Sequence, residues 1–222
     1  TKDWNVRLNA SYNTNHNKVL SIGNAVPFAI GGFSSRTVQT VVAEGEPVGF
    51  IRGYKAVLNP DNSLKEILPL QNLGSTLPTA YGNFSLSASY KNLSFMLSGD
   101  YQYGAYVHSF DRQFRFSKGL KDDAIPEKAL EGLDQGANWL NFTNFFVAKS
   151  DFLKIRNIGI AYDYKPKKYL KSVNLAFNVY NPFAFTASSV DPEAALAGAR
   201  SQGAVAVGGL NYSSYSTPRQ YV

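Results

Sequence analysis

The sequence predicts an all-β fold, and within that class an antiparallel transmembrane β-barrel. Three observations lead to this prediction. Apolar and polar residues alternate with a period of two, aromatic residues gather at the segment ends, and short connections alternate with long ones. Aromatic residues make up 14% of the 222 residues. No apolar run approaches the roughly 18 residues of a transmembrane helix, so a membrane crossing would have to use strands.

The strands are predicted from segments in which every second residue is apolar. These segments are residues 4–13, 83–90, 93–103, 157–164 and 173–180. Successive side chains of a strand point to opposite faces, so each segment has one apolar and one polar face. The polar faces carry Asn, Ser, Gly and Gln rather than Lys and Glu, which favours a crowded wet interior over a solvated surface. Aromatic residues expected at the membrane interfaces are Tyr101, Tyr103, Tyr106, Tyr162, Tyr164 and Phe183.

The connections predict an orientation. Lys91 and Asn92 form a two-residue link, and residues 166–172 form another short link that begins at Pro166. Long excursions occupy residues 107–152 and 182–217, and residues 126–135 within the first are candidates for a short helix. Because outer-membrane barrels have short periplasmic turns and long extracellular loops, both excursions are expected outside the cell.

Residues 14–80 are less regular. Residues 48–57 are predicted as a strand, Gly31 and Gly32 as part of a loop, and residues 59–62 as a turn. The whole chain is expected to hold six to eight strands in one domain. It opens without Met or a signal peptide, and it ends at Val222 just as a strand begins. We therefore expect a piece of a longer protein.

Charge and composition argue against other classes of protein. The net charge is +6, but the nearest basic run, residues 165–171, is broken by Pro166 and by apolar residues. Nucleic acid is therefore not an expected partner. The chain has no Cys, which suits an oxidising compartment such as the periplasm.

Several short motifs occur in a fixed order along nearly the whole chain. They are NKV at 17–19, GEPVGFIRGY at 45–54, ASYKN at 88–92, FLKIRNIGIAY at 152–162, NVYNPF at 178–183, DPE at 191–193 and TPRQY at 217–221. Each motif alone is weak. Together and in this order they resemble the C-terminal region of the SusC/RagA family of TonB-dependent outer-membrane transporters.

The sequence departs from this family at two places. The family's D-x-N-x-D-G stretch is replaced by residues 59–63, and Val222 stands where members end in an aromatic residue. The resemblance implies that residues 1–222 are the C-terminal part of a barrel of about 22 strands. The plug domain and the N-terminal strands would lie upstream.

The resemblance also implies a function and partners. Such transporters sit in the bacterial outer membrane and import oligosaccharides or peptides, driven by TonB through an upstream segment. They work with a SusD-like surface lipoprotein, and their barrel faces outer-membrane lipid. No cofactor is implied.

A search for catalytic, cofactor-binding and metal-binding residues yields none. Only His16 and His108 are present, and there is no G-x-S-x-G elbow or phosphate-binding loop. The protein is therefore predicted not to be an enzyme. The acidic groups Asp122, Asp123, Asp191 and Glu193 are interpreted as loop residues, and the glycosylation pattern at residues 141–143 as having little meaning in a bacterium.

Substrate-binding residues are not assigned. Arg7, Asp100 and Asp163 are expected on the lumen face, where they steer substrate or pair with other charges. Two alternatives remain open from the residues alone. One is a passive porin or structural barrel, and the other is a soluble β-sandwich that binds carbohydrate.

Overall fold

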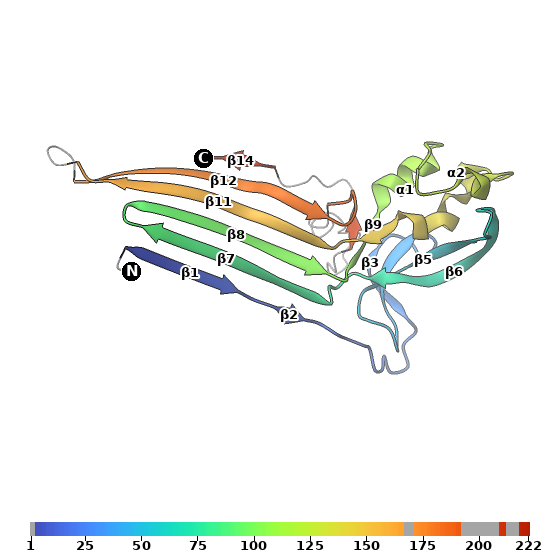
Figure 1. Cartoon of the computed structure of the whole chain (residues 1–222). Helices are drawn as coiled ribbons and strands as arrows, with labels where there is room; N and C mark the ends of the chain where they lie inside the picture. The colour runs from blue at the N-terminus through green and yellow to red at the C-terminus, as the bar shows by residue number, and fades with distance from the viewer. Residues whose placement is uncertain (1–2, 167–170, 192–208, 212–217) are drawn as a thin grey trace.

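A computed structural model describes residues 3–166, 171–191, 209–211 and 218–222, and divides them into two parts (Figure 1). One part is a long antiparallel sheet, which we call the wall. The other is a compact group of strands and short helices at one end of the sheet, which we call the head. The prediction of a mostly antiparallel β fold is confirmed.

The wall is a seven-stranded sheet in the order β1-β7-β8-β11-β12-β14, with β2 also paired to β7. Its strands are β1 (Trp4–Ala10), β2 (Asn13–Thr14), β7 (Ala80–Tyr90), β8 (Leu93–Tyr103), β11 (Phe152–Tyr164), β12 (Val173–Thr186) and β14 (Gln220–Tyr221). Every pairing among them is antiparallel.

The register of the wall places the apolar residues of successive strands opposite one another. The middle row of the apolar face consists of Leu8, Leu86, Leu97, Ile158, Val179 and Tyr221. The row beside it consists of Val6, Ala88, Phe95, Ile160 and Phe177. A slip of one residue would turn every one of these side chains to the other face, so the alternation itself fixes the register.

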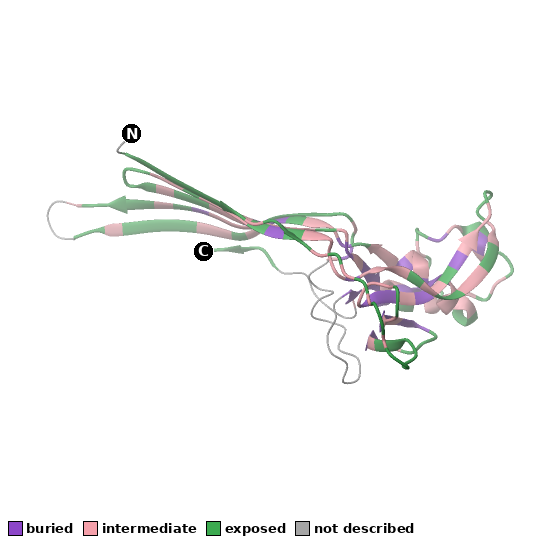
Figure 2. Ribbon diagram, turned by 90° about the horizontal axis from the view of Figure 1, so that it is seen from below, coloured by how far each residue is buried: buried purple, intermediate pink, exposed green. Residues whose placement is uncertain are grey.

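The apolar face of the wall is uncovered. Val6 is 61% exposed, Leu175 is 63% exposed and Phe177 is 52% exposed. Figure 2 shows the strands of the wall mostly exposed, whereas buried residues concentrate in the head. Within the described residues, no second sheet packs against this face.

Aromatic rings lie over glycines on neighbouring strands of the apolar face. A Cβ atom added to Gly99 would meet the ring of Phe84 at 2.4 Å, and one added to Gly82 would meet the Tyr101 hydroxyl at 2.7 Å. That hydroxyl donates a hydrogen bond to the carbonyl oxygen of Ser11 at 3.0 Å. These close contacts require the glycines and help to hold β7 and β8 in register with the segment between β1 and β2.

The two ends of the wall differ as the sequence predicts. At the end away from the head, Lys91 and Asn92 link β7 to β8, and Lys91 adopts a φ of 52°. β11 ends at Tyr164 and β12 begins at Val173 at the same end (Figure 1). The long connections all leave from the opposite end and build the head.

The head consists of three connections of the wall. The β2–β7 connection forms a four-stranded sheet of β3 (Phe28–Gly32), β4 (Val38–Val42), β5 (Phe50–Leu58) and β6 (Leu64–Ser75). The β8–β11 connection contains β9 (Tyr106–Ser109), α1 (Phe110–Ser117), the 3₁₀ helices η1 (Glu127–Leu130) and η2 (Trp139–Phe146), α2 (Gln135–Asn138) and β10 (Val147–Lys149). The β12–β14 connection adds β13 (Leu210–Asn211), which pairs in parallel with β9.

The head has hydrophobic cores of its own. The larger core joins Phe116 of α1 and the Phe142 and Phe146 rings of η2 to Ala56 of β5. A second core joins Val38 and Ile51 of the four-stranded sheet to Phe110 of α1. Connections that are far apart in the sequence therefore fold into one packed unit.

Several sequence predictions about the head are wrong. We expected six to eight strands, but the described residues form fourteen, half of them outside the wall. Gly31 and Gly32 belong to β3 rather than to a loop. A Cβ atom added to Gly32 would lie 2.5 Å from the Val38 carbonyl oxygen, so glycine allows this close strand pairing. The helix expected at residues 126–135 is the short η1 followed by a turn, with α2 beginning at Gln135.

Helix α1 was not predicted. Its local signals are present, because the Ser109 side chain accepts a hydrogen bond from the Arg112 backbone N–H and Asp111 lies in the first turn. Phe110, Gln113 and Phe116 occupy its buried face. The spacing of these residues is helical, but one of the three is polar, which hides the pattern.

The wall is an open sheet within the described residues. Strands β1 and β14 form its two edges, so the sheet does not close into a barrel. No helix in the described part of the chain is long and apolar enough to cross a membrane.

Candidate functional site: the polar mouth of the wall

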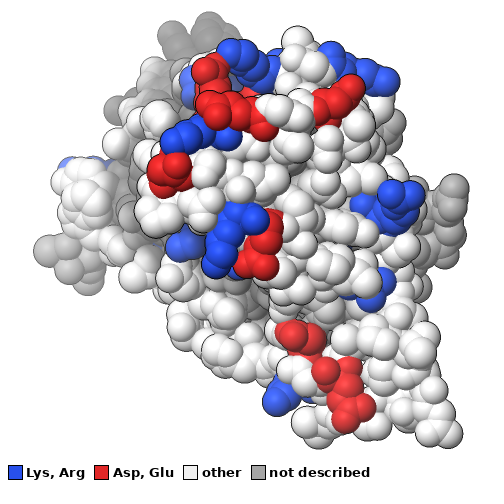
Figure 3. All heavy atoms as spheres, turned by 90° about the vertical axis from the view of Figure 1, so that its right-hand side faces the viewer, with Lys and Arg blue, Asp and Glu red and all other residues white. Residues whose placement is uncertain are grey.

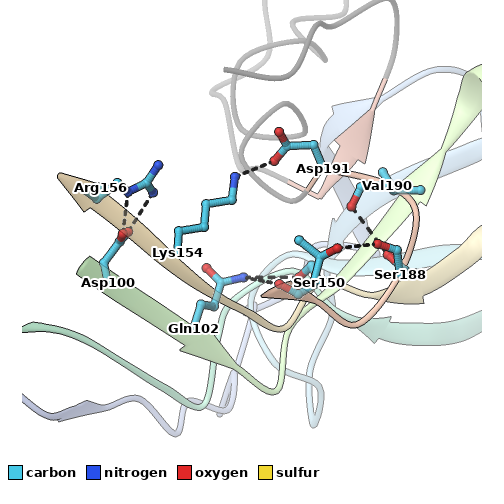
Figure 4. Close-up of polar contacts among 9 residues, drawn as sticks. Asp100, Gln102, Ser150, Lys154, Arg156, Ser188, Val190 and Asp191 are labelled. Carbon is cyan, nitrogen blue, oxygen red and sulfur yellow. Dashed lines mark hydrogen bonds and ion pairs between the residues drawn. The ribbon is translucent and has the colours of Figure 1, made fainter. Parts of the chain in front are cut away.

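The polar face of the wall ends in a cluster of polar side chains where it meets the head (Figure 4). Asp100 and Gln102 lie on β8, and Lys154 and Arg156 lie on the neighbouring strand β11. Lys154 is directly opposite Asp100 in the register. We call these four residues the mouth cluster.

A β-bulge places Arg156 beside Asp100. The pairing of β11 with β8 shifts between Ile155 and Asn157, which makes Arg156 an extra residue in β11. Its Nε atom lies 2.5 Å from Oδ1 of Asp100, and its Nη2 atom lies 2.8 Å from Oδ2. This two-point geometry orients both side chains, although partial exposure to solvent limits the contribution of the pair to stability.

Lys154 binds the segment that follows β12 and so attaches this segment to the wall. The residue is only 5% exposed, and its Nζ atom donates a hydrogen bond to Oδ1 of Asp191 at 2.8 Å. The same ammonium group lies 5.4 Å from the ring centre of Phe152. Since a buried pair leaves an uncompensated charge when one partner is removed, this pair holds residues 186–191 in place.

Gln102 attaches the segment that precedes β11 to strand β8. Its Nε2 atom donates to both the carbonyl oxygen and the hydroxyl of Ser150, each at 3.2 Å. The neighbouring Asp151 carboxylate accepts a hydrogen bond from the Gly104 backbone N–H at 2.7 Å. Both long connections are therefore anchored at the mouth cluster.

Replacing Lys154 by methionine is expected to release residues 186–191 from the wall. The substitution keeps most of the side-chain volume but removes the ammonium group that donates to Asp191. We expect a local loss of about 1.5–3 kcal/mol. Hydrogen exchange of the backbone N–H groups at residues 186–191 measures this change. Lys149→Met, an exposed position, is the matched control, and equal exchange in both variants would contradict this role for Lys154.

A cavity of about 630 Å³ opens beside the mouth cluster. It lies between α1, the segment that follows α1, and residues 189–191. A smaller hollow of about 230 Å³ is lined by Lys154 and Arg156 and shares Ser189 and Asp191 with it. The cavity thus adjoins the charged end of the polar face.

An ion pair between α1 and the segment that follows it makes one side of the cavity rigid. Arg112 donates to Asp122 from Nε at 2.9 Å and from Nη2 at 2.5 Å. Burial opposes ionisation of Asp122, but hydrogen bonds from Arg112 and from the Ala124 backbone N–H outweigh burial and lower the pKa of its carboxyl group. Asp122 is therefore a carboxylate at neutral pH, and it fixes the guanidinium at the cavity surface.

A buried hydrogen-bond chain holds α1 against the rest of the head. Nε2 of His108 lies 2.7 Å from Oε1 of Gln113, and Nε2 of Gln113 donates to the Thr143 hydroxyl at 3.0 Å. The chain joins β9, α1 and η2. All three side chains are fully buried, and Nδ1 of His108 has no hydrogen-bond partner within the described residues.

The buried His108 is expected to make the head sensitive to acid. Its pKa is lowered from 6.5 to about 4, mainly by burial and also by the charge of Arg112, which together outweigh the hydrogen bond with Gln113 that raises it. The unfolded chain therefore binds the proton more readily than the folded head does. The stability that neutral His108 supplies is present above pH 6.5 and is lost as the pH falls toward 4, by on the order of 3 kcal/mol.

Protease protection of the head, measured from pH 7 to pH 4, tests this dependence. The parent chain is expected to lose protection over that range, and His108→Gln is expected to flatten the profile. His16→Gln, an exposed position on the β2–β3 connection, is the control and should follow the parent. If His108→Gln keeps the steep acid loss, His108 is not its source.

The polar face also has a shallow hollow in its middle. The hollow has a volume of about 420 Å³, and its lining includes Arg7, Met96 and Asn178 together with small residues of four strands. These small residues are Ser87, Ser89, Ser94, Gly159, Ala161 and Ala176. The opposed rows of small side chains leave room on this face for another protein segment or for solvent.

The structure tests where the candidate residues lie. Arg7, Asp100 and Asp163 belong to polar-face positions of the wall, as predicted. Asp100 pairs with Arg156. Asp163 lies near the end of the wall away from the head, where it accepts a hydrogen bond of 2.7 Å from Asn174. The mouth cluster therefore contains one of the three.

The other candidates are spread over the head. Asp122 and Asp123 line the cavity, and Asp191 lines it from the opposite side. His16 is exposed on a connection, and Thr143 of the glycosylation pattern is buried in η2. Glu193 lies outside the described residues. No group of three or more His, Cys, Asp or Glu side chains within the described ranges is placed to hold a metal ion.

Sequence reasoning missed the basic side chains of the site. Lys154, Arg112 and Arg115 were not singled out, although Lys154 interrupts an otherwise apolar strand opening, Phe152–Leu153–Lys154–Ile155. A charge in such a position signals a buried partner. Its partner Asp191 is 37 residues away, a separation that no local pattern reveals.

The outer end of the head carries charges of both signs. Figure 3 shows acidic and basic side chains in adjacent groups on this face. Lys128 of η1 bonds Asp61 at the β5–β6 turn with an Nζ–Oδ2 distance of 2.7 Å, and Lys121 pairs with Glu127. The hydrogen bond from Lys128 lowers the pKa of the Asp61 carboxyl group. This face presents mixed charge rather than a basic stripe.

Together these features define a class of fold. It is an antiparallel wall with one apolar and one polar face, capped at one end by a head made of its own connections. Neither a family model nor a curated protein matches the sequence.

Solved structures match the whole chain. It is similar to a chain of the RagAB peptide importer in the "closed-closed" state, with 19% identity and a TM-score of 0.67. It is also similar to the importer in the "open-open" state, with 18% identity and a TM-score of 0.65, and to the RagAB peptide transporter, with 19% identity and a TM-score of 0.65. Each match covers 100% of this chain and 26–27% of the solved chain. The chain therefore spans about a quarter of their length, and the likeness establishes a shared fold.

Proposed function

We propose that this chain forms the C-terminal part of the barrel of a SusC-like, TonB-dependent transporter in the bacterial outer membrane. The whole protein imports peptides or oligosaccharides and works with a SusD-like surface lipoprotein. The remaining strands of the barrel, a plug domain and the TonB-contacting segment belong to the rest of the protein.

One observation carries this proposal, namely an uncovered apolar face on a sheet of alternating strands. Strands β7 and β8 have 11 residues each, which matches the roughly 9–11 residues of a transmembrane strand. In a sandwich the apolar face would be covered by a second sheet, and here Leu175 and Phe177 are more than half exposed. Lipid is the solvent that suits such a face.

Two further observations support the proposal. All long connections leave one end of the wall, and the tight β7–β8 turn lies at the other, where β11 also ends and β12 begins, as in outer-membrane barrels. The motif order resembles SusC/RagA transporters, and the whole chain fits the fold of a RagAB importer chain. The head would then stand outside the cell, and the polar face would line the lumen. Nothing in this arrangement calls for catalysis, and we propose a transporter rather than an enzyme.

Uptake by cells that carry the full-length protein tests this function. We expect the protein in the outer-membrane fraction, together with a surface lipoprotein, and we expect uptake of labelled peptides or oligosaccharides to stop when a protonophore collapses the proton gradient. Uptake that continues without the gradient would indicate a passive porin. A protein that stays folded and monomeric in buffer without detergent would contradict the membrane location altogether.

A further inference from the structure

The cavity beside the mouth cluster has the lining of a binding site for a charged ligand. Of its eleven lining residues, three are basic and four are acidic, and Val190 is the one apolar residue. Its volume of about 630 Å³ falls within the range of small-ligand pockets, roughly 300–1,000 Å³. We propose that this cavity binds substrate peptides that carry both positive and negative charges. The inference rests on the proposed import function and specifies its substrate class.

The balance of charge selects the ligand. Arg112, Arg115 and Lys121 face the cavity together with Asp111, Asp122, Asp123 and Asp191. A polyanion would meet four carboxylates, and a polycation would meet three basic groups, so a ligand of one sign gains little. A peptide that presents a carboxylate to the basic side chains and an ammonium group to the acidic ones satisfies both sets.

Two of these side chains are placed to receive the ligand. Neither Arg115 of α1 nor Asp123 forms an ion pair with another residue in the part of the chain that the structure describes, and both are exposed. Arg112 is already fixed by Asp122 at two points. We therefore assign Arg115 to a ligand carboxylate, Asp123 to a ligand ammonium group, and the Arg112–Asp122 pair to the rigid floor between them.

The lining disfavours a neutral oligosaccharide. The faces of sugar rings expose C–H groups, which pack well on aromatic side chains. The cavity has no aromatic lining residue among those that the structure describes. A neutral sugar would also have to displace water from the exposed Arg115 and Asp123 side chains without supplying an opposite charge to either.

The floor of the cavity is organised before a ligand arrives. Phe110 and Phe116 anchor α1 in the two cores of the head, and Gln113 ties it to His108 and Thr143. The opposite side is held by Lys154 through Asp191. Because both sides are already fixed, the protein loses little conformational entropy when a ligand binds, and this favours affinity.

Binding to the full-length transporter with its lipoprotein tests the inference. The probes are a short repeating Ala-Lys-Ala-Glu peptide with free termini, the same peptide with Gln in place of Lys and Glu and with blocked termini, and maltoheptaose. We expect the charged peptide to bind at least about tenfold more tightly than the neutral peptide. Arg115→Gln and Asp123→Asn should each weaken the binding of the charged peptide by about five- to tenfold and leave the binding of the neutral peptide unchanged.

Lys118→Gln is the matched control, because Lys118 ends α1 outside the cavity and packs on Phe114. It should bind the charged peptide as the parent does. Equal binding of the charged and neutral peptides, displacement of the charged peptide by maltoheptaose, or no effect of Arg115→Gln and Asp123→Asn would each overturn the inference. If the inference fails, gradient-driven uptake of a neutral substrate would still support the import function. Failure of the inference is therefore distinguishable from failure of the proposed function.

Discussion

Val179→Arg is expected to destabilise the folded protein in a bilayer by about 2–4 kcal/mol, the value for a basic residue on the lipid face at the midplane. Val179 lies in the middle row of the apolar face, between Ile158 and Tyr221. If this face meets hydrocarbon, the guanidinium must either leave water or drag water into the membrane. Denaturant titration of the full-length protein refolded into lipid vesicles measures the change.

The matched control is Asn178→Arg, one residue away on the same strand. Asn178 lies on the polar face and lines the hollow of about 420 Å³, which leaves room for a longer side chain. This variant should fold with nearly the parent stability. Similar losses for Val179→Arg and Asn178→Arg would mean that the two faces do not differ in environment.

Phe142→Ala is expected to destabilise the head by about 3–5 kcal/mol, the usual range for removing a buried ring. Phe142 is fully buried, and its ring centre lies 5.9 Å from that of Phe116 in an edge-on arrangement. The substitution opens a void between η2 and α1. Protease cleavage within residues 110–146 reports the loosened core.

Phe114→Ala is the control for the core, because Phe114 lies on α1, the helix whose Phe116 packs against Phe142, but is itself 46% exposed. It should change the cleavage rate little. The wall should stay folded in both variants, since its strands pair with one another and its apolar face does not rest on the head. Loss of the whole protein from the membrane in Phe142→Ala would contradict this independence of the two parts.

The wall could be predicted from the sequence because period-two alternation is a local property. Each of β1, β7, β8, β11 and β12 shows it, and the link at Lys91 and Asn92 fixed one hairpin. The polar-face positions of Arg7 and Asp100 follow from the same alternation. The open edges at β1 and β14 could not be predicted in this way, because alternation along one strand carries no information on whether a sheet closes.

The head could not be predicted in detail because non-local packing decides it. β5 and η2 meet through contacts such as the hydrogen bond from the Ala56 backbone N–H to Asn144, 88 residues away. The pairing of Lys154 with Asp191 and the bulge at Arg156 have the same origin. The charged cavity therefore had no sequence signal beyond Asp122, Asp123 and Asp191, which were interpreted as loop residues.

The lipid contact of the apolar face is the central claim, and the absence of Cys from these 222 residues offers a direct test. Single cysteines are placed at Ala176, Phe177, Asn178 and Val179 of the full-length protein, spin-labelled, and compared for collision with oxygen and with a water-soluble nickel chelate in bilayers. We predict alternation, with oxygen access high at Phe177 and Val179 and chelate access high at Ala176 and Asn178. Chelate access at all four positions, or access to neither probe at Phe177 and Val179, would contradict a lipid-facing wall.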